Sequence, residues 1–246
     1  MQIELNHLLD PARWAADTLG FEPDPIQAEM LRSRAPRILL NCSRQWGKST
    51  VTAAKAVHRA LMVPELLVVA MSPSARQTAE LLRKMGGFLK ACGSPIKGDG
   101  DNEMSFLLRN GSRIVGLPGG EAHIRGFSSV GLLIIDEAAR VSDASYRAAR
   151  PMLAVGGGSL LLLSTPFGKR GFFYEAWKSK EAWLRIQARA ADCSRIPAAF
   201  LEEEKRNLGD TWFRQEYCCE FIDNETRLFS DELIERALDK NLETLF

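Results

Sequence analysis

The sequence contains few of the residues that build disulfide scaffolds or zinc sites. Its 246 residues include 5 cysteines and 3 histidines, and the cysteines are scattered, with no CxxC pair among them. An odd number of scattered cysteines indicates reduced thiols rather than a disulfide framework. No histidine stands at ligand spacing from a cysteine, as a structural zinc site would require. Neither a disulfide scaffold nor a cysteine-based zinc site is therefore expected.

Long hydrophobic runs are missing as well. The longest apolar stretches, 66–71 and 160–163, are far shorter than the ~20 residues of a membrane-spanning helix. The N-terminal residues, MQIELNHLLDPARW, include acidic side chains and lack the basic and apolar blocks of a secretory signal. We therefore expect no membrane partner and a protein that stays in the cytoplasm of its cell.

Neither sign of charge dominates, because 32 Lys and Arg stand against 31 Asp and Glu, a formal net charge of +1. This balance neither requires nor excludes a polyanionic partner. The composition, 46% hydrophobic and 26% charged, is that of an ordinary globular protein. The function must therefore be sought in motifs rather than in composition.

Short apolar runs alternate with helical stretches along most of the chain. We predict strands at 37–42, 66–71, 132–135 and 160–163, and helices at 11–19, 48–62, 75–91 and 144–152. Strands that are apolar on both faces and alternate with helices are typical of a parallel sheet covered on both sides. The predicted fold class is α/β, a doubly wound sheet.

Two further patterns set the predicted domain organisation. Asn110-Gly111, between strand-like runs 105–109 and 112–117, predicts an inserted antiparallel hairpin. Beyond Thr165 the pattern changes to a last strand at 183–188 and helices at 198–207, 212–221 and 231–238. We expect a core over 1–169, a small helical subdomain over 170–230 and a linker over 231–246.

The sharpest motif lies between the first predicted strand and the helix that follows it. Residues 42–50 read CSRQWGKST, which matches GxxxxGK[ST] except that Cys42 replaces the first glycine. Backbone N–H groups of such a loop bind phosphate oxygens at a helix N-terminus. Lys48 would neutralise phosphate charge and Ser49 would hold Mg²⁺. A bare GK[ST] string also occurs by chance, but its strand-turn-helix setting favours a phosphate loop.

Two carboxylates end the apolar strand near the middle of the chain. Asp136 and Glu137 follow LLII directly, the pattern in which one carboxylate reaches the Mg²⁺ ligands and the next polarises the attacking water. The alternative is an acidic pair that caps a following helix. The preceding phosphate loop favours the catalytic interpretation.

Two weaker signals stand before and after these motifs. Gln27, after Asp24-Pro25, could offer a donor and an acceptor to an adenine edge; a glutamine that merely follows a turn proline is the alternative. Ser164 and Thr165 end the strand at 160–163, where they could sense the γ-phosphate or simply form a turn.

Together, the glutamine motif, SRQxGKS, IIDEA and STP followed by GKRGFFYE resemble the ATPase domain of the large terminase subunit of tailed bacteriophages. The resemblance covers about residues 23–229. Ser43-Arg44-Gln45 in place of glycine-rich residues, and Asp136-Glu137-Ala138-Ala139, are typical of that family. It implies an additional-strand, RecA-like P-loop ATPase with a small lid subdomain, and the missing first glycine agrees with it.

The resemblance also implies individual roles. Arg44 would contact the γ-phosphate or a lid group, and Arg125 would reach a neighbouring subunit's nucleotide as an arginine finger; a plain salt bridge is the alternative for Arg125. Ser164 and Thr165 would couple hydrolysis to movement. The expected catalytic residues are Glu137, Arg44 and Arg125, the Mg²⁺ ligands Ser49 and Asp136, and the ATP-binding residues Gln27, Ser43, Arg44, Gln45, Trp46, Gly47, Lys48, Ser49, Thr50, Ser164 and Thr165.

The implied function is Mg²⁺-dependent ATP hydrolysis that drives double-stranded DNA into a procapsid in the cytoplasm of an infected bacterium. The implied partners are duplex DNA, a portal protein, a small terminase subunit and further copies of the chain in a ring. Large terminases normally continue into a metal-dependent nuclease domain, and we expect no nuclease activity in this chain. A helicase-type ATPase and a nucleotide-binding sensor remain as alternatives. A sensor would not need Glu137, and monomeric helicases need two RecA-like domains.

Overall fold

An eight-stranded sheet forms the centre of the molecule, with the order β3-β4-β5-β2-β6-β7-β1-β8. The computed structural model describes residues 7, 9–94, 97–99, 102–117 and 126–223. The strands are β1 (Arg37–Cys42), β2 (Leu67–Met71), β3 (Lys97–Asp99), β4 (Asn102–Leu107), β5 (Arg113–Leu117), β6 (Leu132–Asp136), β7 (Ser159–Ser164) and β8 (Leu184–Ala188).

The parallel part of the sheet confirms the predicted α/β class. Strands β2, β6, β7, β1 and β8 are parallel neighbours, and β7 lies between β1 and β6. β7 is thus an additional strand between the strand before the GKS loop and the strand before the carboxylates, as the resemblance implied. Its register pairs Ser164 with Asn41 on one side and Leu163 with Asp136 on the other. The carboxyl ends of β6, β7 and β1 therefore meet at one edge of the sheet.

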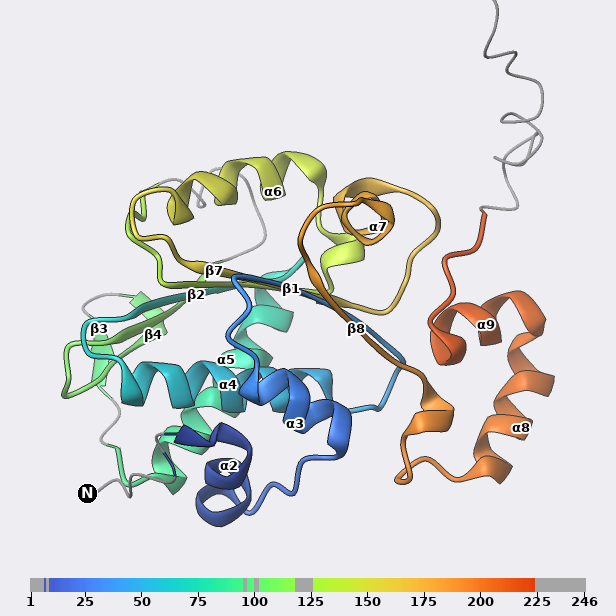
Figure 1. Ribbon diagram of the computed structural model, residues 1–246, viewed down its shortest axis with the longest axis horizontal. Coiled ribbons are helices and arrows are strands. Elements are labelled where there is room, and N and C mark those ends of the chain that lie inside the picture. The colour runs from blue at the N-terminus through green and yellow to red at the C-terminus, as the bar shows by residue number, and fades with distance from the viewer. Residues whose placement is uncertain (1–6, 8, 95–96, 100–101, 118–125, 224–246) are drawn as a thin grey trace, which may run out of the picture.

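Helices cover both faces of this sheet (Figure 1). One face packs against α2 (Pro11–Leu19), α3 (Pro25–Arg32), α4 (Lys48–Met62) and α5 (Ala75–Ala91), and the other against α6 (Asp143–Ala149) and α7 (Gly171–Lys178). Each face has its own hydrophobic cluster, because the strands alternate their apolar side chains between the two layers. None of the helices in the described ranges is long and apolar enough to cross a membrane.

The predicted hairpin is present and extends further than expected. β4 and β5 pair antiparallel, and Gly111 between them has a positive φ of 81°. β4 also pairs antiparallel with β3, a strand that sequence reasoning missed because it is only three residues long. β5 then joins the parallel part through β2.

Other elements differ from the prediction in detail. The expected helix at 144–152 is α6 followed by the 3-10 segment η3 (Arg150–Leu153), because Pro151 cannot continue the α-helical hydrogen bonds. Helix α3 was not predicted, although Asp24 and Gln27 form a capping box at its start. The predicted helix at 231–238 lies outside the described residues.

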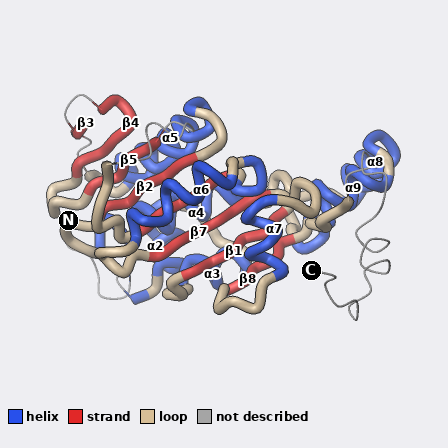
Figure 2. Tube along the Cα trace, turned by 90° about the horizontal axis from the view of Figure 1, so that it is seen from above, coloured by secondary structure: helices blue, strands red, loops and turns tan. Residues whose placement is uncertain are grey.

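The C-terminal part of the described chain leaves the sheet after β8. It consists of η4 (Ala190–Asp192), α8 (Ala198–Leu208) and α9 (Asp210–Cys218). Helices α8 and α9 lie past the carboxyl ends of the strands (Figure 2). β8 falls within the expected lid of 170–230 but is hydrogen-bonded to β1 in the sheet. The division at residues 169 and 170 stays a prediction, and the purely helical part begins only with η4.

Candidate active site at the carboxyl edge of the sheet

The loop between β1 and α4 presents backbone N–H groups at a helix N-terminus. Gln45 and Gly47 have positive φ values of 61° and 100°, and α4 begins at Lys48 without a side-chain cap. Within the described chain, the backbone N–H groups of 45–49 donate no hydrogen bond, whereas those of Thr50 and Val51 already bond the Gly47 carbonyl. Uncapped N–H groups beside a positive helix end form an anion-binding concavity.

Buried side chains hold this loop from inside. Trp46 is fully buried and its carbonyl accepts hydrogen bonds from Gln27 Nε2 at 3.0 Å and Arg195 Nη2 at 2.7 Å. Ser43 is buried as well, and its backbone N–H donates to the Ala188 carbonyl of β8. The Trp46 and Ser43 side chains therefore belong to the support of the loop, and only their backbone could face a ligand.

Gln27 is also part of this support. Its side-chain oxygen accepts from Asp24 N at 3.0 Å while its amide donates to Trp46, and the residue is fully buried. Adenine recognition by Gln27 stays a prediction. In the described structure its side chain joins the start of α3 to the GKS loop.

The two predicted carboxylates lie at the end of β6. Asp136 Oδ1 accepts the Glu137 backbone N–H at 2.9 Å. Burial raises the pKa of Asp136 to about 6, against the opposing charge of Lys48. Glu137 has a positive φ of 51°, in the region that L-residues rarely occupy. That conformation turns the chain sharply from the buried strand into η2 (Ala138–Arg140).

Lys48 joins the loop to this edge. Its Nζ lies 2.7 Å from Glu137 Oε1. Burial alone would lower the pKa of the Lys48 ammonium, but nearby negative groups, Glu137 and Asp136 among them, raise it above its usual value. Lys48 therefore carries a positive charge, fixed by its ion pair with Glu137, at the position where the loop would bind a phosphate.

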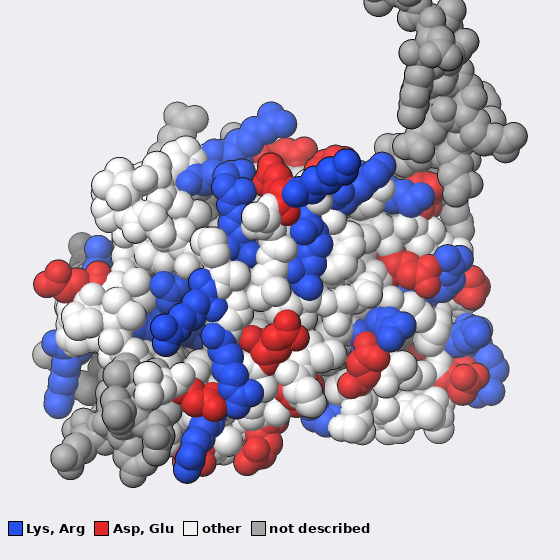
Figure 3. Space-filling view, viewed as in Figure 1, with Lys and Arg blue, Asp and Glu red and all other residues white. Residues whose placement is uncertain are grey.

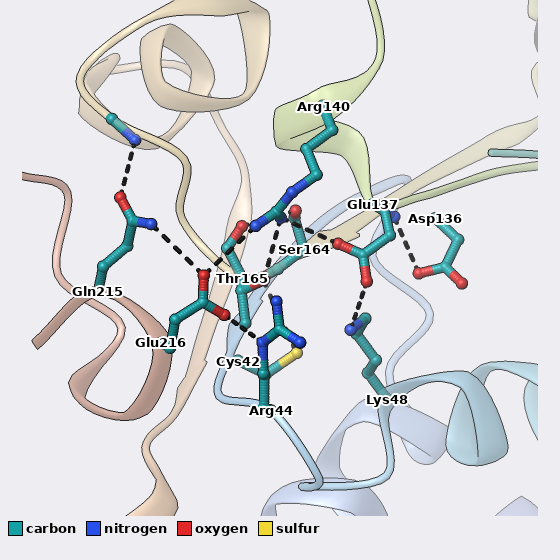
Figure 4. A network of polar contacts seen from close by, with 11 residues as sticks. Cys42, Arg44, Lys48, Asp136, Glu137, Arg140, Ser164, Thr165, Gln215 and Glu216 are labelled. Carbon is teal, nitrogen blue, oxygen red and sulfur yellow. Dashed lines mark hydrogen bonds and ion pairs between the residues drawn. The ribbon is translucent and has the colours of Figure 1, made fainter. Parts of the chain in front are cut away.

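The other oxygen of Glu137 contacts a residue that sequence reasoning missed. Arg140 Nη1 lies 3.2 Å from Glu137 Oε2 and donates to Thr165 Oγ1 at 3.2 Å (Figure 4). Ser164 is fully buried and its hydroxyl donates to the Thr165 carbonyl, so only Thr165 of this pair faces the site.

Helix α9 also contributes to the polar contacts around Arg140. Glu216 is 4% exposed and pairs with Arg44 Nε through Oε2 and with Arg140 Nη2, 3.4 Å away, through Oε1. Backbone bonding reinforces the contact, because Arg44 N donates to the Glu216 carbonyl at 3.1 Å. Arg44 thus contacts a residue of the C-terminal helices, and its predicted contact with the γ-phosphate or a lid group stays a prediction.

A cavity of about 360 Å³ opens between these elements. It combines loop residues, the carboxylate edge and two residues of α5 that carry no motif. Its lining comprises Arg44, Gln45, Gly47, Lys48, Ser49, Gln77, Lys84, Glu137, Arg140 and Thr165. Gln77 and Lys84 stand seven residues apart on one helix, a spacing that places both on the same face.

A larger cavity of about 450 Å³ lies at the opposite edge of the sheet. Lys55 lines it, but its Nζ already donates to the carbonyls of Met30, Leu31 and Ser33 at 2.8–3.1 Å. The lining contains no carboxylate. Size alone therefore does not identify the site, because the predicted catalytic groups Lys48 and Glu137 line the smaller cavity.

A divalent cation would find Asp136 as its carboxylate here. Within the described residues, no three His, Cys, Asp or Glu side chains cluster as a metal cage. Mg²⁺ keeps several waters and commonly binds one or two carboxylates together with phosphate oxygens. Asp136 interacts electrostatically with Lys48 at the start of α4, and Ser49 is the next residue of that helix, so Asp136 and Ser49 fit that pattern. Arg125, the predicted finger, lies outside the described residues.

The mainly parallel sheet, with helices on both faces, defines an α/β protein of RecA-like fold. The sequence profile described as terminase large subunit, T4likevirus-type, N-terminal, matches residues 39–236. The chain therefore belongs to this family of terminase large subunits.

Individual relatives agree with the assignment. The large terminase subunit of Escherichia phage T5 is 26% identical over 76% of this chain and 44% of that protein. The large terminase subunit of Thermus virus P23-45 is 24% identical over 90% of this chain and 53% of that protein. The chain thus spans about half the length of these curated relatives.

Solved structures support the fold. The large terminase ATPase domain of Thermus phage P74-26 matches with a TM-score of 0.76 and 22% identity, over 87% of this chain and all of that domain. A large terminase from another thermophilic bacteriophage, solved in complex with ADP, matches with a TM-score of 0.64 and 15% identity, over 80% of this chain and 53% of that one.

Proposed function

We propose that this chain hydrolyses ATP, with Mg²⁺, to drive double-stranded viral DNA into a procapsid. The observation that carries the proposal is the meeting of Lys48, Asp136 and Glu137 beside the uncapped N–H groups of 45–49. These are the parts that nucleotide hydrolysis requires: a phosphate cradle, a cation ligand and a base. A large terminase of similar fold from a thermophilic bacteriophage was solved in complex with ADP, which supports nucleotide binding by this fold.

In the proposed mechanism, the ATP phosphates bind the N–H groups of 45–49 and draw Lys48 away from Glu137. Charge-assisted bonds to phosphate compete with the 2.7 Å ion pair that Lys48 makes now. Glu137 Oε1 is thereby free to accept a proton from water. That water attacks the γ-phosphorus while the bond to the bridging oxygen breaks.

The remaining groups stabilise charge. Ser49 and Asp136 would hold Mg²⁺, which neutralises phosphate charge when bound. Arg44, Thr165 and Lys84 line the cavity where the γ-phosphate would lie. Arg125 would act on the nucleotide of a neighbouring copy in a ring. Adenine would lie toward α3, near Gln27.

The proposed partners follow from the family: duplex DNA, a portal protein and a small terminase subunit, in the cytoplasm of an infected bacterium. On the face shown in Figure 3, Lys and Arg side chains are interspersed with Asp and Glu rather than gathered into one basic patch. A DNA surface of one sign is therefore not apparent on that face.

ATP turnover tests the proposal. We would measure hydrolysis with Mg²⁺ over a range of protein concentrations for wild type, Arg125→Ala and the control Arg109→Ala, an exposed arginine of the β4–β5 hairpin. The rate per subunit should rise with concentration in wild type and Arg109→Ala only, and duplex DNA should raise it more than single-stranded DNA. No hydrolysis at any concentration would refute the ATPase. A rate per subunit independent of concentration would refute the shared site.

A further inference from the structure

Arg140 contacts three segments that lie far apart in the sequence. It extends from η2, directly after β6, and its guanidinium lies over the Phe167 ring with 4.7 Å between Cζ and the ring centroid. Nη1 contacts Glu137 and Thr165, both at 3.2 Å, while Nη2 lies 3.4 Å from Glu216. Its planar fork thus touches the proposed base, the end of β7 and helix α9 at once.

The Glu216 carboxylate is buried, so losing its contacts with the arginines would cost free energy. Its side chain is 4% exposed, and a buried carboxylate needs cationic or hydrogen-bonding partners. Arg44, Arg140 and Gln215 provide them, the last by donating from Nε2 at 3.4 Å. A shift of α9 away from the sheet would separate Glu216 from both arginines.

Glu137 has both of its oxygens engaged, but by partners of different kinds. Lys48 holds Oε1 and belongs to the loop that would bind phosphate; Arg140 holds Oε2 and belongs to η2. An incoming triphosphate competes for Lys48 at the start of α4, where the uncapped N–H groups lie. The bond to Arg140 is then the one that still orients the carboxylate.

We propose that Arg140 is a positioning residue that aligns the Glu137 carboxylate. Through its contact with Glu216, Arg140 also makes the orientation of Glu137 depend on the position of helix α9. With α9 seated on the sheet, Glu216 holds one arm of Arg140 and the other arm directs Glu137. With α9 displaced, Arg140 is free to turn and Glu137 loses its alignment. The inference rests on the proposed role of Glu137 as base.

Turnover and nucleotide affinity test it together. The variants are Arg140→Gln, Arg140→Lys, Glu216→Gln and the double variant, with Arg147→Gln as control because Arg147 is an exposed arginine of neighbouring α6. We expect Arg140→Gln to lower kcat about tenfold or more, with KM and the Kd for a non-hydrolysable ATP analogue changed less than about threefold. Arg140→Lys should recover part of kcat.

Non-additivity is the decisive result. Glu216→Gln alone should lower kcat about threefold, and adding it to Arg140→Gln should lower kcat no further. If the two effects multiply, Glu216 acts through Arg44 or the fold, and the coupling is wrong. A kcat for Arg140→Gln within about twofold of wild type, while Glu137→Gln is inactive, overturns the inference alone. Equal turnover in wild type and Glu137→Gln overturns the proposed function instead.

Amide hydrogen exchange provides a readout that does not need turnover. In Glu216→Gln, the peptide covering 137–141 should exchange faster than in wild type, and in Arg147→Gln it should not. Unchanged exchange at 137–141 in Glu216→Gln would contradict the proposed link between α9 and Glu137, even if the isolated chain hydrolyses ATP too slowly to measure.

Discussion

Two lysines of helix α4 point to opposite edges of the sheet and have opposite electrostatic surroundings. Lys48 lies beside Glu137 at the carboxyl edge, and nearby negative groups reverse the effect of burial and raise its pKa. Lys55 lines the cavity at the other edge, where burial lowers its pKa to about 7. One helix therefore carries the same residue type in two different roles.

The partners explain the difference. Lys48 has a single carboxylate, which an incoming anion can replace. Lys55 Nζ already donates to three backbone carbonyls at the end of α3, so it has no hydrogen left to offer a ligand. A buried lysine is a candidate for phosphate binding only where its present partner can be exchanged.

We expect the largest effect on ATP turnover, which should differ between substitutions of Lys48 and of Lys55. Lys48→Met should lower ATP turnover about a hundredfold or more, because the phosphate charge loses its neutralising partner. Lys55→Met should keep turnover within about twofold of wild type at 20 °C, since no atom of Lys55 faces the proposed site. Turnover is measured as steady-state phosphate release. An equal loss of turnover in both variants would contradict the different roles assigned to Lys48 and Lys55.

The next effect concerns stability. Lys55→Met leaves carbonyls of Met30, Leu31 and Ser33 without their donor, which should lower the free energy of unfolding by about 2 kcal/mol. Urea denaturation measures it, with the exposed Lys90→Met as control, expected within about 0.5 kcal/mol of wild type. An unchanged midpoint for Lys55→Met would mean that the carbonyls find other donors.

Lowering the pH should weaken Mg·ATP binding at the carboxyl edge through protonation of Asp136. Because burial raises the pKa of Asp136 to about 6, protons compete with Mg²⁺ well above the usual range of an aspartate. At a fixed concentration of fully ionised Mg·ATP, the apparent affinity should fall about tenfold per pH unit below about 6 and stay constant above it. An affinity that begins to fall only near pH 4 would place Asp136 outside the metal site.

The smallest effect tests the loop backbone. Gly47 has φ 100°, and a Cβ there would lie 3.1 Å from Gln27 Nε2. Gly47→Ala should therefore cost about 1 kcal/mol and weaken ATP affinity about fivefold. Gly87→Ala in α5 is the matched control, because a Cβ there meets nothing within 4 Å. Equal affinity of the two variants for ATP, measured by titration, would contradict a strained phosphate loop.

The parallel sheet and the positions of the GKS loop and carboxylates could be predicted from sequence because each depends on a contiguous pattern. The strand RILLNC and the residues GKS that start α4 are adjacent in the chain, and LLII precedes Asp136 directly. Local patterns of this kind survive folding because their backbone geometry is set by neighbours along the chain.

Arg140, Lys84 and Glu216 could not be found in this way. Arg140 meets Glu216 across 76 positions of sequence, and nothing in the spacing of either residue encodes the contact. One signal was available for Gln27, because Asp-x-x-Gln before a helix matches a capping box and predicts the bond that its side chain makes to Asp24. Sequence reasoning weighed adenine contact against a glutamine that merely follows a turn proline, and it did not predict this bond.

In the proposed mechanism, Lys48 holds Glu137 at rest, and Glu137 acts as base once phosphate binds the lysine in its place. The most direct measurement compares ATP affinity and single-turnover hydrolysis in wild type and Glu137→Gln. We predict that Glu137→Gln binds ATP at least as tightly as wild type, because a competitor for Lys48 is gone, while hydrolysis falls about a hundredfold or more. Hydrolysis within about twofold of wild type would contradict it.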